Sequence, residues 1–262
     1  LRAVPGRQFL CSMYESTGLP SGWADHVNRK AERLIVPSEW LVDVFQEAGV
    51  KRPIHVVHGG VDPQEFPVVD TPPRDDVYTF LAFGDRGSRK GQDIAWAAFY
   101  EAFGDQPDVR LLIKARPCNL GWLDLTHSDR RIAVWREDVD SLAEVFQMAD
   151  CFVFPTRGEG WGLPPREAAC MGKPVITTRW SGTAVGIDHW AIPIERYQLV
   201  PSLLHGDWAM PDVSEVAAHM RWCYEHREAA RQKGLAAAQW LRDHQTWDHS
   251  ARQMLDLLEQ VS

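Results

Sequence analysis

The feature that most constrains the fold is an alternation of short β-rich segments with segments of helical period, which begins at residue 33. The strand-like segments are RLIVP, IHVVH, VYTFLAF, VRLLIK, RIAVW, CFVFP and PVITT. Helical segments between them repeat apolar residues at intervals of three and four, as Leu41, Val44, Phe45 and Ala48 do. Such alternation predicts a parallel sheet with helices on both faces, so the expected fold class is α/β.

One Pro- and Asp-rich segment divides the chain. PVVDTPPRDD, residues 67–76, is the strongest linker signal, and the strand and helix pattern restarts after it. Before it, Ser38 is a candidate cap of a helix that Gly49 ends. After it, helices are expected over residues 91–103, 140–149 and 164–171, and again from about residue 212 to the end, with no further strand. The sequence therefore predicts two domains.

Composition excludes several classes of function. The 36 acidic and 28 basic side chains give a formal net charge of −8, and no run of five Lys or Arg residues occurs, which argues against a nucleic-acid-binding protein. No apolar run approaches the roughly 18 residues of a membrane span, and LRAVPGRQFL lacks the apolar core of a signal peptide, so a cytoplasmic protein is expected. The cysteines, which we expect to be reduced thiols and not zinc ligands, are Cys11, Cys118, Cys151, Cys170 and Cys223.

Loops that follow the strands of a parallel sheet share one edge, and three of these loops carry unusual residues. The first, GDRGSRKG at residues 84–91, is called the basic turn here; it holds Arg86, Arg89 and Lys90. Backbone N–H groups, a helix N-terminus and fixed cations together suit a diphosphate. A solvated basic turn remains an equal alternative on these residues alone.

The second loop is TRGEGWG, residues 156–162, which we call the glutamate loop and which precedes the helical PPREAACMG. Proline lacks an N–H group, so the free backbone donors before the helix belong to Gly160, Trp161, Gly162 and Leu163. Glu167 falls in the expected first turn, where the helix dipole favours a carboxylate by about 0.3 to 1 kcal/mol. Glu159 lies between two glycines, where no helix stabilises it, and is the stronger functional candidate.

The third loop is TTRWSGTAVG, residues 177–186, which we call the serine loop. It offers the small residues Ser181, Gly182 and Thr183 at the same edge, although a plain polar loop is an equal alternative. Asp138 and Asp140 form a D-x-D pattern, but it immediately precedes a helical run, so Asp140 is expected to be an N-cap and no metal site is predicted.

Taken together, several motifs resemble the retaining glycosyltransferases of family 4, which have the GT-B fold of two facing Rossmann-like domains. They are EGWGLPPRE, which looks like that family's glutamate, seven residues, glutamate motif, followed by AACMGKPVITT, with SRKG, LIVPSEW and VVHGGVD elsewhere. The resemblance covers nearly the whole chain. It implies that residues 1–66 are the last part of an acceptor-side domain, residues 67–240 a donor-binding domain, and residues 241–262 a helix returning to the first domain.

The resemblance also implies roles for single residues. Glu167 is expected to bind the ribose of a nucleotide sugar, with Ser181, Gly182 and Thr183 as further nucleotide contacts. Glu159 and the N–H groups of Gly160, Trp161, Gly162 and Leu163 are expected to hold the donor sugar. Lys90 would neutralise the leaving diphosphate without a metal. The family's usual arginine position is Asp85 here, so either Arg86 or Arg89 is expected to act beside Lys90 and Glu159 in catalysis.

The predicted function is transfer of a hexose from a nucleotide-diphosphate sugar to a saccharide or lipid-linked acceptor, with retention, without a metal or cofactor. Family members normally have a complete domain ahead of a segment like MYESTGLPSGW, whereas this chain starts at Leu1. The alternative is therefore a nucleotide-sugar binding fragment or module without turnover, and a third hypothesis is a Rossmann-like interaction domain. No nucleic-acid partner is expected; a membrane surface is left open but not indicated.

Overall fold

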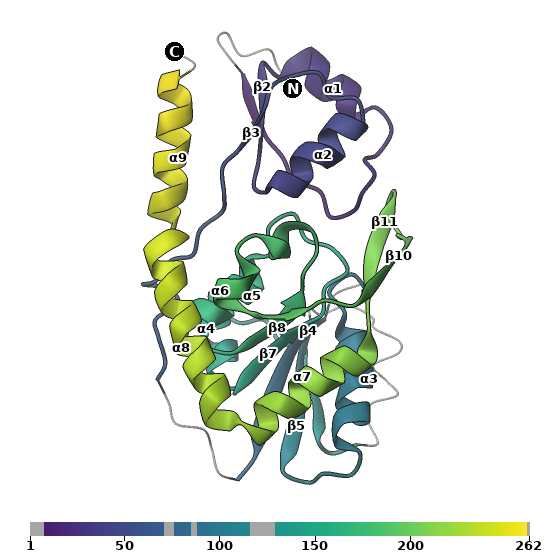
Figure 1. Ribbon diagram of the computed structural model, residues 1–262, viewed down its shortest axis with the longest axis vertical. Helices are drawn as coiled ribbons and strands as arrows, with labels where there is room; N and C mark the ends of the chain where they lie inside the picture. Colours follow the sequence, from purple (N-terminus) through teal and green to yellow (C-terminus); the bar gives the residue numbers. More distant parts are fainter. Residues whose placement is uncertain (1–7, 71–75, 85–87, 116–128, 261–262) are drawn as a thin grey trace.

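The structure is a computed structural model that describes residues 8–70, 76–84, 88–115 and 129–260 (Figure 1). Its N-terminal part, residues 8–66, contains a parallel sheet in the order β1-β2-β3. The elements are β1 (Phe9–Cys11), α1 (Trp23–Lys30), β2 (Arg33–Val36), α2 (Glu39–Glu47) and β3 (Ile54–Val56). The apolar face of α2, with Leu41 and Phe45, is buried against Leu34 and Val36 of β2. The apolar residues that repeat with the 3.6-residue helical period therefore form the core of this part.

A larger parallel sheet follows, with six strands in the order β6-β5-β4-β7-β8-β9. The strands are β4 (Tyr78–Gly84), β5 (Val109–Ala115), β6 (Ile132–Trp135), β7 (Cys151–Phe154), β8 (Val175–Thr178) and β9 (Ile192–Ile194). The chain builds outward from β4 to β6, then returns to β7 beside β4 and builds the other way. Loops at such a reversal leave a crevice at the carboxyl ends of the strands, where α/β proteins bind ligands. The basic turn and the glutamate loop follow the two strands at this reversal.

Helices cover both faces of the larger sheet (Figure 1). They are α3 (Gln92–Phe103), α4 (Leu142–Gln147), α5 (Leu163–Cys170), α6 (Ile187–Trp190), α7 (Val213–Glu225) and α8 (Arg227–His244), with a short 3₁₀ helix η2 (Ser181–Ala184). Along β4, Phe80 and Ala82 face α3 and α7, whereas Leu81 and Phe83 face the layer of α4, α5 and α8. Alternate residues of a strand point to opposite faces, which explains why VYTFLAF is apolar throughout. The α/β class is confirmed.

The seven predicted strands all occur, each within two residues of its expected ends, but the sequence did not indicate β1, β9 or the antiparallel hairpin of β10 (Tyr197–Pro201) and β11 (Asp207–Pro211). These strands are short, and Pro193 and Pro201 lie within β9 and β10. Proline is tolerated because β9 is an edge strand and the hairpin has only two strands. The sequence thus missed the strands between PVITT and residue 212, whereas the expectation of no strand from about residue 212 onward is confirmed in the described residues.

Two helix boundaries also differ from the prediction. The long helical run after residue 212 is divided at His226 into α7 and α8. Asp140 is not the cap of α4; Ser141 is, because its hydroxyl accepts a hydrogen bond of 3.2 Å from the N–H of Ala143. Adjacent Asp and Ser residues are equally good caps by type, so only the backbone conformation distinguishes them.

The N-terminal part and the larger part are joined where two segments cross between them. The N–H of Val61 donates to the carbonyl of Gln245 (2.9 Å), and the N–H of Trp247 donates to the carbonyl of Val61 (3.2 Å). Beyond this crossing, α9 (Trp247–Gln260) lies beside the N-terminal part, and the N–H of His58 bonds Gln253 Oε1 at 2.9 Å (Figure 1). The crossing therefore fixes where the chain passes from one part to the other.

Candidate functional site

The predicted loops meet at the carboxyl edge of the larger sheet. The basic turn and the glutamate loop are joined by the N–H of Arg157, which donates to the carbonyl of Arg89 at 2.7 Å. The glutamate and serine loops are joined by the N–H of Gly182, which donates to the carbonyl of Glu159 at 2.8 Å. Residues 88–91, 156–162 and 177–186 are thus joined at one edge, although they are far apart in the sequence. Asp85 and Arg86 lie outside the described residues.

Glu159 lies at the centre of this surface and is only 9% exposed. Its Oε1 accepts a hydrogen bond of 2.7 Å from Nη1 of Arg89, and the same nitrogen donates to the carbonyl of Gly158 at 2.7 Å. Its own N–H donates to the hydroxyl of Ser181 at 3.0 Å. Arg89 therefore contacts Glu159 directly, and Glu159 is the acid that the sequence singled out.

Glu167 lies further along its helix than the sequence suggested. Helix α5 begins at Leu163, so Glu167 is in its second turn, and the proposed stabilisation in a first turn was wrong. Burial raises the pKa of Glu167 from 4.5 to about 7; the nearby charge of Glu65 also raises it, and that of Lys90 opposes the rise. Its Oε2 is buried and makes no hydrogen bond with the described residues. A buried carboxylate oxygen of this kind is suited to accept a hydrogen bond from a bound hydroxyl group.

The backbone of the glutamate loop presents N–H groups that no described protein group accepts. The carbonyl of Glu159 accepts from Gly182, and that of Gly160 accepts from the hydroxyl of Ser38 at 3.0 Å. The carbonyls of Trp161 and Gly162 both accept from the side chain of Arg166. In a trans peptide the N–H points opposite to the carbonyl. The N–H groups of Gly160, Trp161, Gly162 and Leu163 therefore point away from these partners.

The serine loop is held tightly by its own side chains. Ser181 has a φ of 57°, the only positive φ among the described residues that are not glycine. A Cβ atom on Gly182 would lie 2.3 Å from the carbonyl oxygen of Gly160, so only glycine fits between the two loops. Thr183 is fully buried, and its hydroxyl contacts the carbonyls of Thr178 (2.7 Å) and Trp180 (2.8 Å). The side chain of Thr183 thus shapes the loop, and the predicted nucleotide contacts of Ser181, Gly182 and Thr183 remain predictions.

The N-terminal part forms the second side of the site. Ser38 precedes α2 but its hydroxyl does not cap the helix; it donates instead to Gly160 across the two parts. The rings of Trp40 and Trp180 meet edge to face at 5.1 Å. Residues 13–15 pack so closely that a Cβ atom on Gly158 would lie 2.1 Å from the carbonyl oxygen of Glu15. The site is therefore built from both parts of the chain.

Sequence reasoning missed two arginines. Arg157 is 3% exposed and forms a bidentate pair with Asp93, at 2.8 and 2.7 Å. The pair joins the glutamate loop to the first turn of α3, which follows the basic turn. Arg166 is fully buried on α5, with its guanidinium carbon 3.8 Å from the ring centre of Trp161. Burial lowers the pKa of Arg166 to about 9, against the opposing charge of Glu159, so it stays charged at neutral pH. The weak signal for both was a basic residue in a stretch of glycine, proline and apolar residues.

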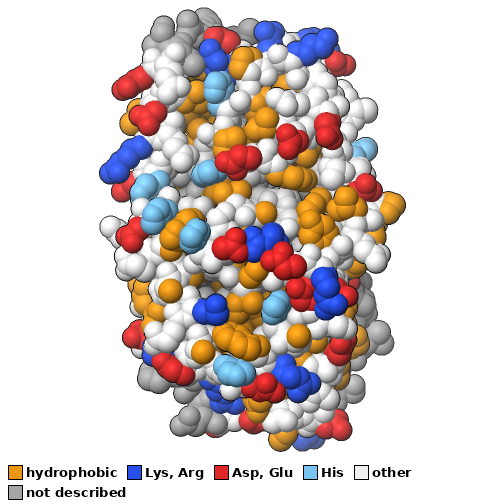
Figure 2. Space-filling view, in the orientation of Figure 1, with side chains coloured by type: hydrophobic (Ala, Val, Ile, Leu, Met, Phe, Trp, Pro, Cys, Tyr) orange, Lys and Arg blue, Asp and Glu red, His pale blue; other side chains and the backbone are white. Residues whose placement is uncertain are grey.

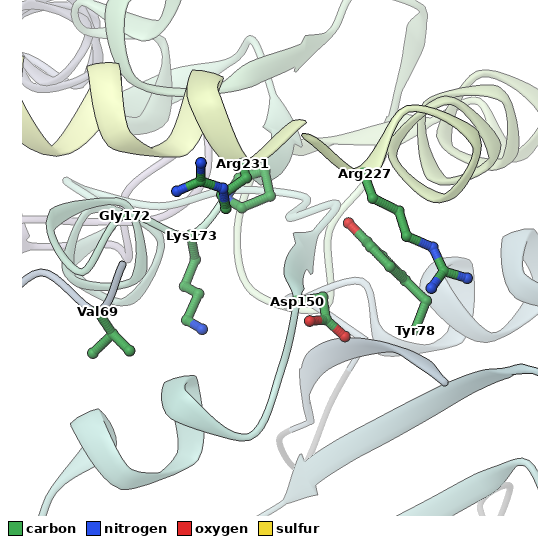
Figure 3. A pocket seen from close by; sticks show the side chains of 8 residues that line it. Val69, Tyr78, Asp150, Gly172, Lys173, Arg227 and Arg231 are labelled. Atoms are coloured by element: carbon green, nitrogen blue, oxygen red, sulfur yellow. The ribbon is translucent and has the colours of Figure 1, made fainter. Parts of the chain in front are cut away.

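A hollow lies at the opposite, amino-terminal ends of the strands (Figure 3). Tyr78 and Asp150, at the starts of β4 and β7, line it together with Lys173, Arg227 and Arg231. Arg227 lies 3.5 Å from Asp108, and Arg231 pairs with Glu228 at 2.7 Å. Because these arginines already have acidic partners and the hollow is at the wrong edge of the sheet, it does not qualify as the ligand site.

Neither a strongly charged patch on the face drawn in Figure 2 nor a group of metal ligands among the described residues marks a further site. Figure 2 shows Lys and Arg side chains interspersed with Asp and Glu over one face of the molecule. Within the described ranges, no three His, Cys, Asp or Glu side chains are grouped so as to hold a metal ion. In the same part of the chain, no helix combines the length and apolar character needed to cross a membrane.

Comparison with known proteins now identifies the family. The family model "Family 4 Glycosyltransferase in conflict systems" matches residues 37–254. The chain belongs to this family. The family 4 glycosyltransferase resembles a D-inositol 3-phosphate glycosyltransferase of Jonesia denitrificans, with 30% identity over 79% of this chain and 51% of the relative. A mannosylfructose-phosphate synthase of Agrobacterium fabrum is 24% identical over 89% of this chain and 54% of the relative. The chain spans about half the length of these curated relatives.

Solved structures share the fold of this glycosyltransferase. HepE of Anabaena, in complex with UDP and glucose, superimposes with a TM-score of 0.69 at 17% identity, over 90% of this chain and 65% of HepE. A glycosyltransferase of Rickettsia africae gives a TM-score of 0.73 at 14% identity, over 97% of this chain and 70% of its own. The predicted family and its GT-B-type fold are confirmed.

Proposed function

We propose that this family 4 glycosyltransferase binds a nucleotide-diphosphate sugar between its two parts and transfers a hexose to a saccharide or lipid-linked acceptor. The observation that carries the proposal is the buried Oε2 of Glu167, which has no hydrogen-bond partner among the described residues. A buried polar atom without a partner costs roughly 1 to 3 kcal/mol, and a ribose hydroxyl group would supply the missing donor. Glu167 lies close enough to Lys90 for the lysine charge to act on its pKa, which supports a ribose contact at Glu167 beside a phosphate contact at Lys90.

The donor sugar is assigned to the glutamate loop. Glu159 supplies a carboxylate that accepts hydrogen bonds from sugar hydroxyls, and the outward N–H groups of residues 160–163 donate to them. In the structure Oε1 of Glu159 accepts a hydrogen bond of 2.7 Å from Arg89. A diphosphate competes for the same guanidinium, because an arginine binds phosphate oxygens as well as it binds a carboxylate. Donor binding therefore draws Arg89 toward the phosphates and releases the Glu159 carboxylate for the sugar.

The bond between the sugar and the diphosphate breaks with negative charge developing on the leaving phosphate oxygen. Lys90 and Arg89, from one turn that the sheet fixes in place, stabilise that charge without reorganisation. This assignment needs no metal ion, and metal independence is part of the proposal. For transfer with retention, the acceptor approaches the anomeric carbon from the face that the diphosphate leaves, so acceptor groups are expected from the N-terminal part of the chain.

The names of the relatives guide the choice of substrates. UDP and glucose are bound in the HepE structure, and the curated relatives include an enzyme named for inositol 3-phosphate and one named for mannosylfructose phosphate. We therefore place UDP-glucose and GDP-mannose first among donors. Small polyol and sugar phosphates are the first acceptors to add to the saccharide and lipid-linked classes.

The test follows the anomeric proton of the sugar by NMR during incubation of the chain with UDP-glucose or GDP-mannose and each acceptor, with and without magnesium. Transfer with an unchanged anomeric configuration, lost in Lys90→Ala, is the expected result. Lys173→Ala is a matched control, because Lys173 lines the hollow at the other edge of the sheet. Inversion of the product refutes the retaining mechanism, and donor binding without turnover supports the binding-module alternative.

A further inference from the structure

The side chain of Arg166 is matched to an unusually complete set of acceptors. A guanidinium has five N–H donors, and Arg166 contacts five oxygen atoms. Nη1 donates to the carbonyls of Trp161 and, at 3.3 Å, Gly162. Nη2 donates to the carbonyls of Gly182 (3.1 Å) and Val185 (3.0 Å), and Nε donates to Oε1 of Gln245 (3.1 Å). One side chain therefore ties the glutamate loop, the serine loop and the crossing between the two parts.

These contacts fix the directions of the peptide groups. The carbonyls of Trp161 and Gly162 are turned toward Arg166, so the N–H groups of the next residues, Gly162 and Leu163, are turned away from it. The same argument turns the N–H of Thr183 away, because the carbonyl of Gly182 is held at 3.1 Å. Without these bonds, the flexible glycine at position 162, whose φ is 86°, would leave the orientation of the loop amides undefined.

Stability alone does not explain this residue. Arg166 is fully buried between the rings of Trp161 and Trp190, at 3.8 and 4.5 Å, and makes no ion pair among the described residues. Burying a charge is costly, and an apolar side chain between two tryptophans would often stabilise a core at least as well. What an apolar side chain cannot do is hold four carbonyl groups in fixed directions.

Gln245 connects this arrangement to the crossing. Its side chain accepts from Arg166, and its backbone carbonyl accepts from the N–H of Val61 at 2.9 Å. On the other face of the loop, the ring of His58 stacks on that of Trp161 at 5.2 Å. Both segments that pass between the parts therefore touch the glutamate loop, one through Arg166 and one through Trp161.

We propose that Arg166 is a positioning residue for donor recognition, which directs the N–H groups of the glutamate loop at the donor sugar and, through Gln245, links that loop to the crossing between the two parts. The inference rests on the proposed function, since it assigns the sugar to this loop. Arg166 does not touch the substrate; it acts through the peptide groups that it holds.

The test compares Arg166→Lys, Arg166→Met and Gln245→Met with Arg242→Met as matched control. Arg242 lies on α8, three residues before Gln245. It donates to the carbonyls of Phe66 (3.1 Å) and Cys170 (3.3 Å), and Cys170 is the last residue of α5. Two quantities are measured in the full chain. One is the ratio of the affinities for UDP-glucose and UDP, with GDP-mannose and GDP in parallel, by calorimetry. The other is the hydrogen-exchange rate of the Gly182 amide, which donates to Glu159.

We expect Arg166→Met to lose about tenfold in nucleotide-sugar affinity relative to the nucleoside diphosphate, equivalent to a hydrogen bond or two, and Arg166→Lys to lose less. Gln245→Met should shift the ratio in the same direction by less, and the Gly182 amide should exchange faster in all three. Lysine has three donors for five acceptors, so Arg166→Lys folds but rescues only in part. Arg242→Met should lower the melting temperature and leave both quantities unchanged.

The two proposals fail in different ways. If Arg166→Lys and Gln245→Met keep the wild-type affinity ratio and the wild-type Gly182 exchange rate, the positioning role is wrong while nucleotide-sugar binding stands. If the wild-type chain binds none of the four probes and neither ADP nor TDP, the proposed function is wrong and the donor-recognition role falls with it. Equal changes in Arg166→Met and Arg242→Met would reduce Arg166 to a structural residue.

Discussion

Replacing Glu167 by glutamine should stabilise the unliganded protein at alkaline pH. The pKa of Glu167 is raised from 4.5 to about 7 on folding, mainly by burial. Below pH 4.5 both the folded and the unfolded chain hold the proton, so the group costs nothing. As the pH rises to 7, the unfolded chain releases the proton while the folded chain retains it, and the free energy of unfolding falls. The full loss above pH 7 is about 3 kcal/mol, at about 1.4 kcal/mol for each pKa unit.

The assay is urea unfolding of the wild type and Glu167→Gln at pH 5, 6, 7 and 8, with the free energy of unfolding taken from linear extrapolation. The neutral amide avoids the loss, so the variant should gain up to about 3 kcal/mol over the wild type at pH 8 and little at pH 5. Glu101→Gln, at an exposed position of α3, is the control and should show no pH-dependent difference. A Glu167→Gln variant that is no more stable than the wild type at pH 8, or a difference that is constant with pH, refutes the reasoning.

The same substitution should weaken nucleotide binding, because an amide offers the ribose one acceptor oxygen in place of two. A gain in stability that accompanies a loss of binding is typical of a residue kept for function. A Glu167→Gln variant with both higher stability and unchanged nucleotide affinity would show that Glu167 is not part of the nucleotide site.

Three further predictions follow from the loops of the site. Lys90→Ala should lower diphosphate affinity with little change in melting temperature, measured by calorimetry; equal affinity would remove Lys90 from the site. Arg157→Lys should destabilise the fold by about 1 to 3 kcal/mol in urea unfolding, since it breaks a bidentate pair with Asp93 that lysine cannot replace, and a neutral effect would contradict that pairing. Gly182→Ala should cost about 1 to 3 kcal/mol, because its Cβ would meet the Gly160 carbonyl at 2.3 Å, and an unchanged melting curve would show that the loops are not so closely packed.

The sequence predicted the place of the site better than its internal contacts. Parallel strands put their following loops at one edge, so the glutamates, Arg89 and Lys90 were expected together from strand order alone. The contacts of Arg166 could not be expected, because its acceptors are backbone carbonyls of Trp161, Gly182 and Val185 and a side chain 79 residues away. Backbone acceptors leave no residue-type signal.

Ser38 shows the same limit in another form. Its position before an amphipathic run predicted a helix cap, and the backbone does place it there, but its hydroxyl bonds Gly160 of the other part. Local pattern identifies the helix end, whereas the choice of partner depends on how the two parts pack. The hairpin of β10 and β11 was missed for a related reason, since two short strands that pair only with each other carry no clear alternation of apolar residues.

The most direct test of nucleotide-sugar binding is a thermal-shift panel with UDP, GDP, ADP and TDP, each in EDTA and in magnesium. A ligand at about 100 times its Kd adds roughly 2.7 kcal/mol of stability, which for a chain of this size is a shift of roughly 5 to 10 °C. We predict that one of the four nucleotides gives such a shift, equally in EDTA and magnesium, and that Glu167→Gln largely removes it. No shift with any nucleotide, or a shift that Glu167→Gln leaves undiminished, would contradict the assignment of these loops to a nucleotide sugar.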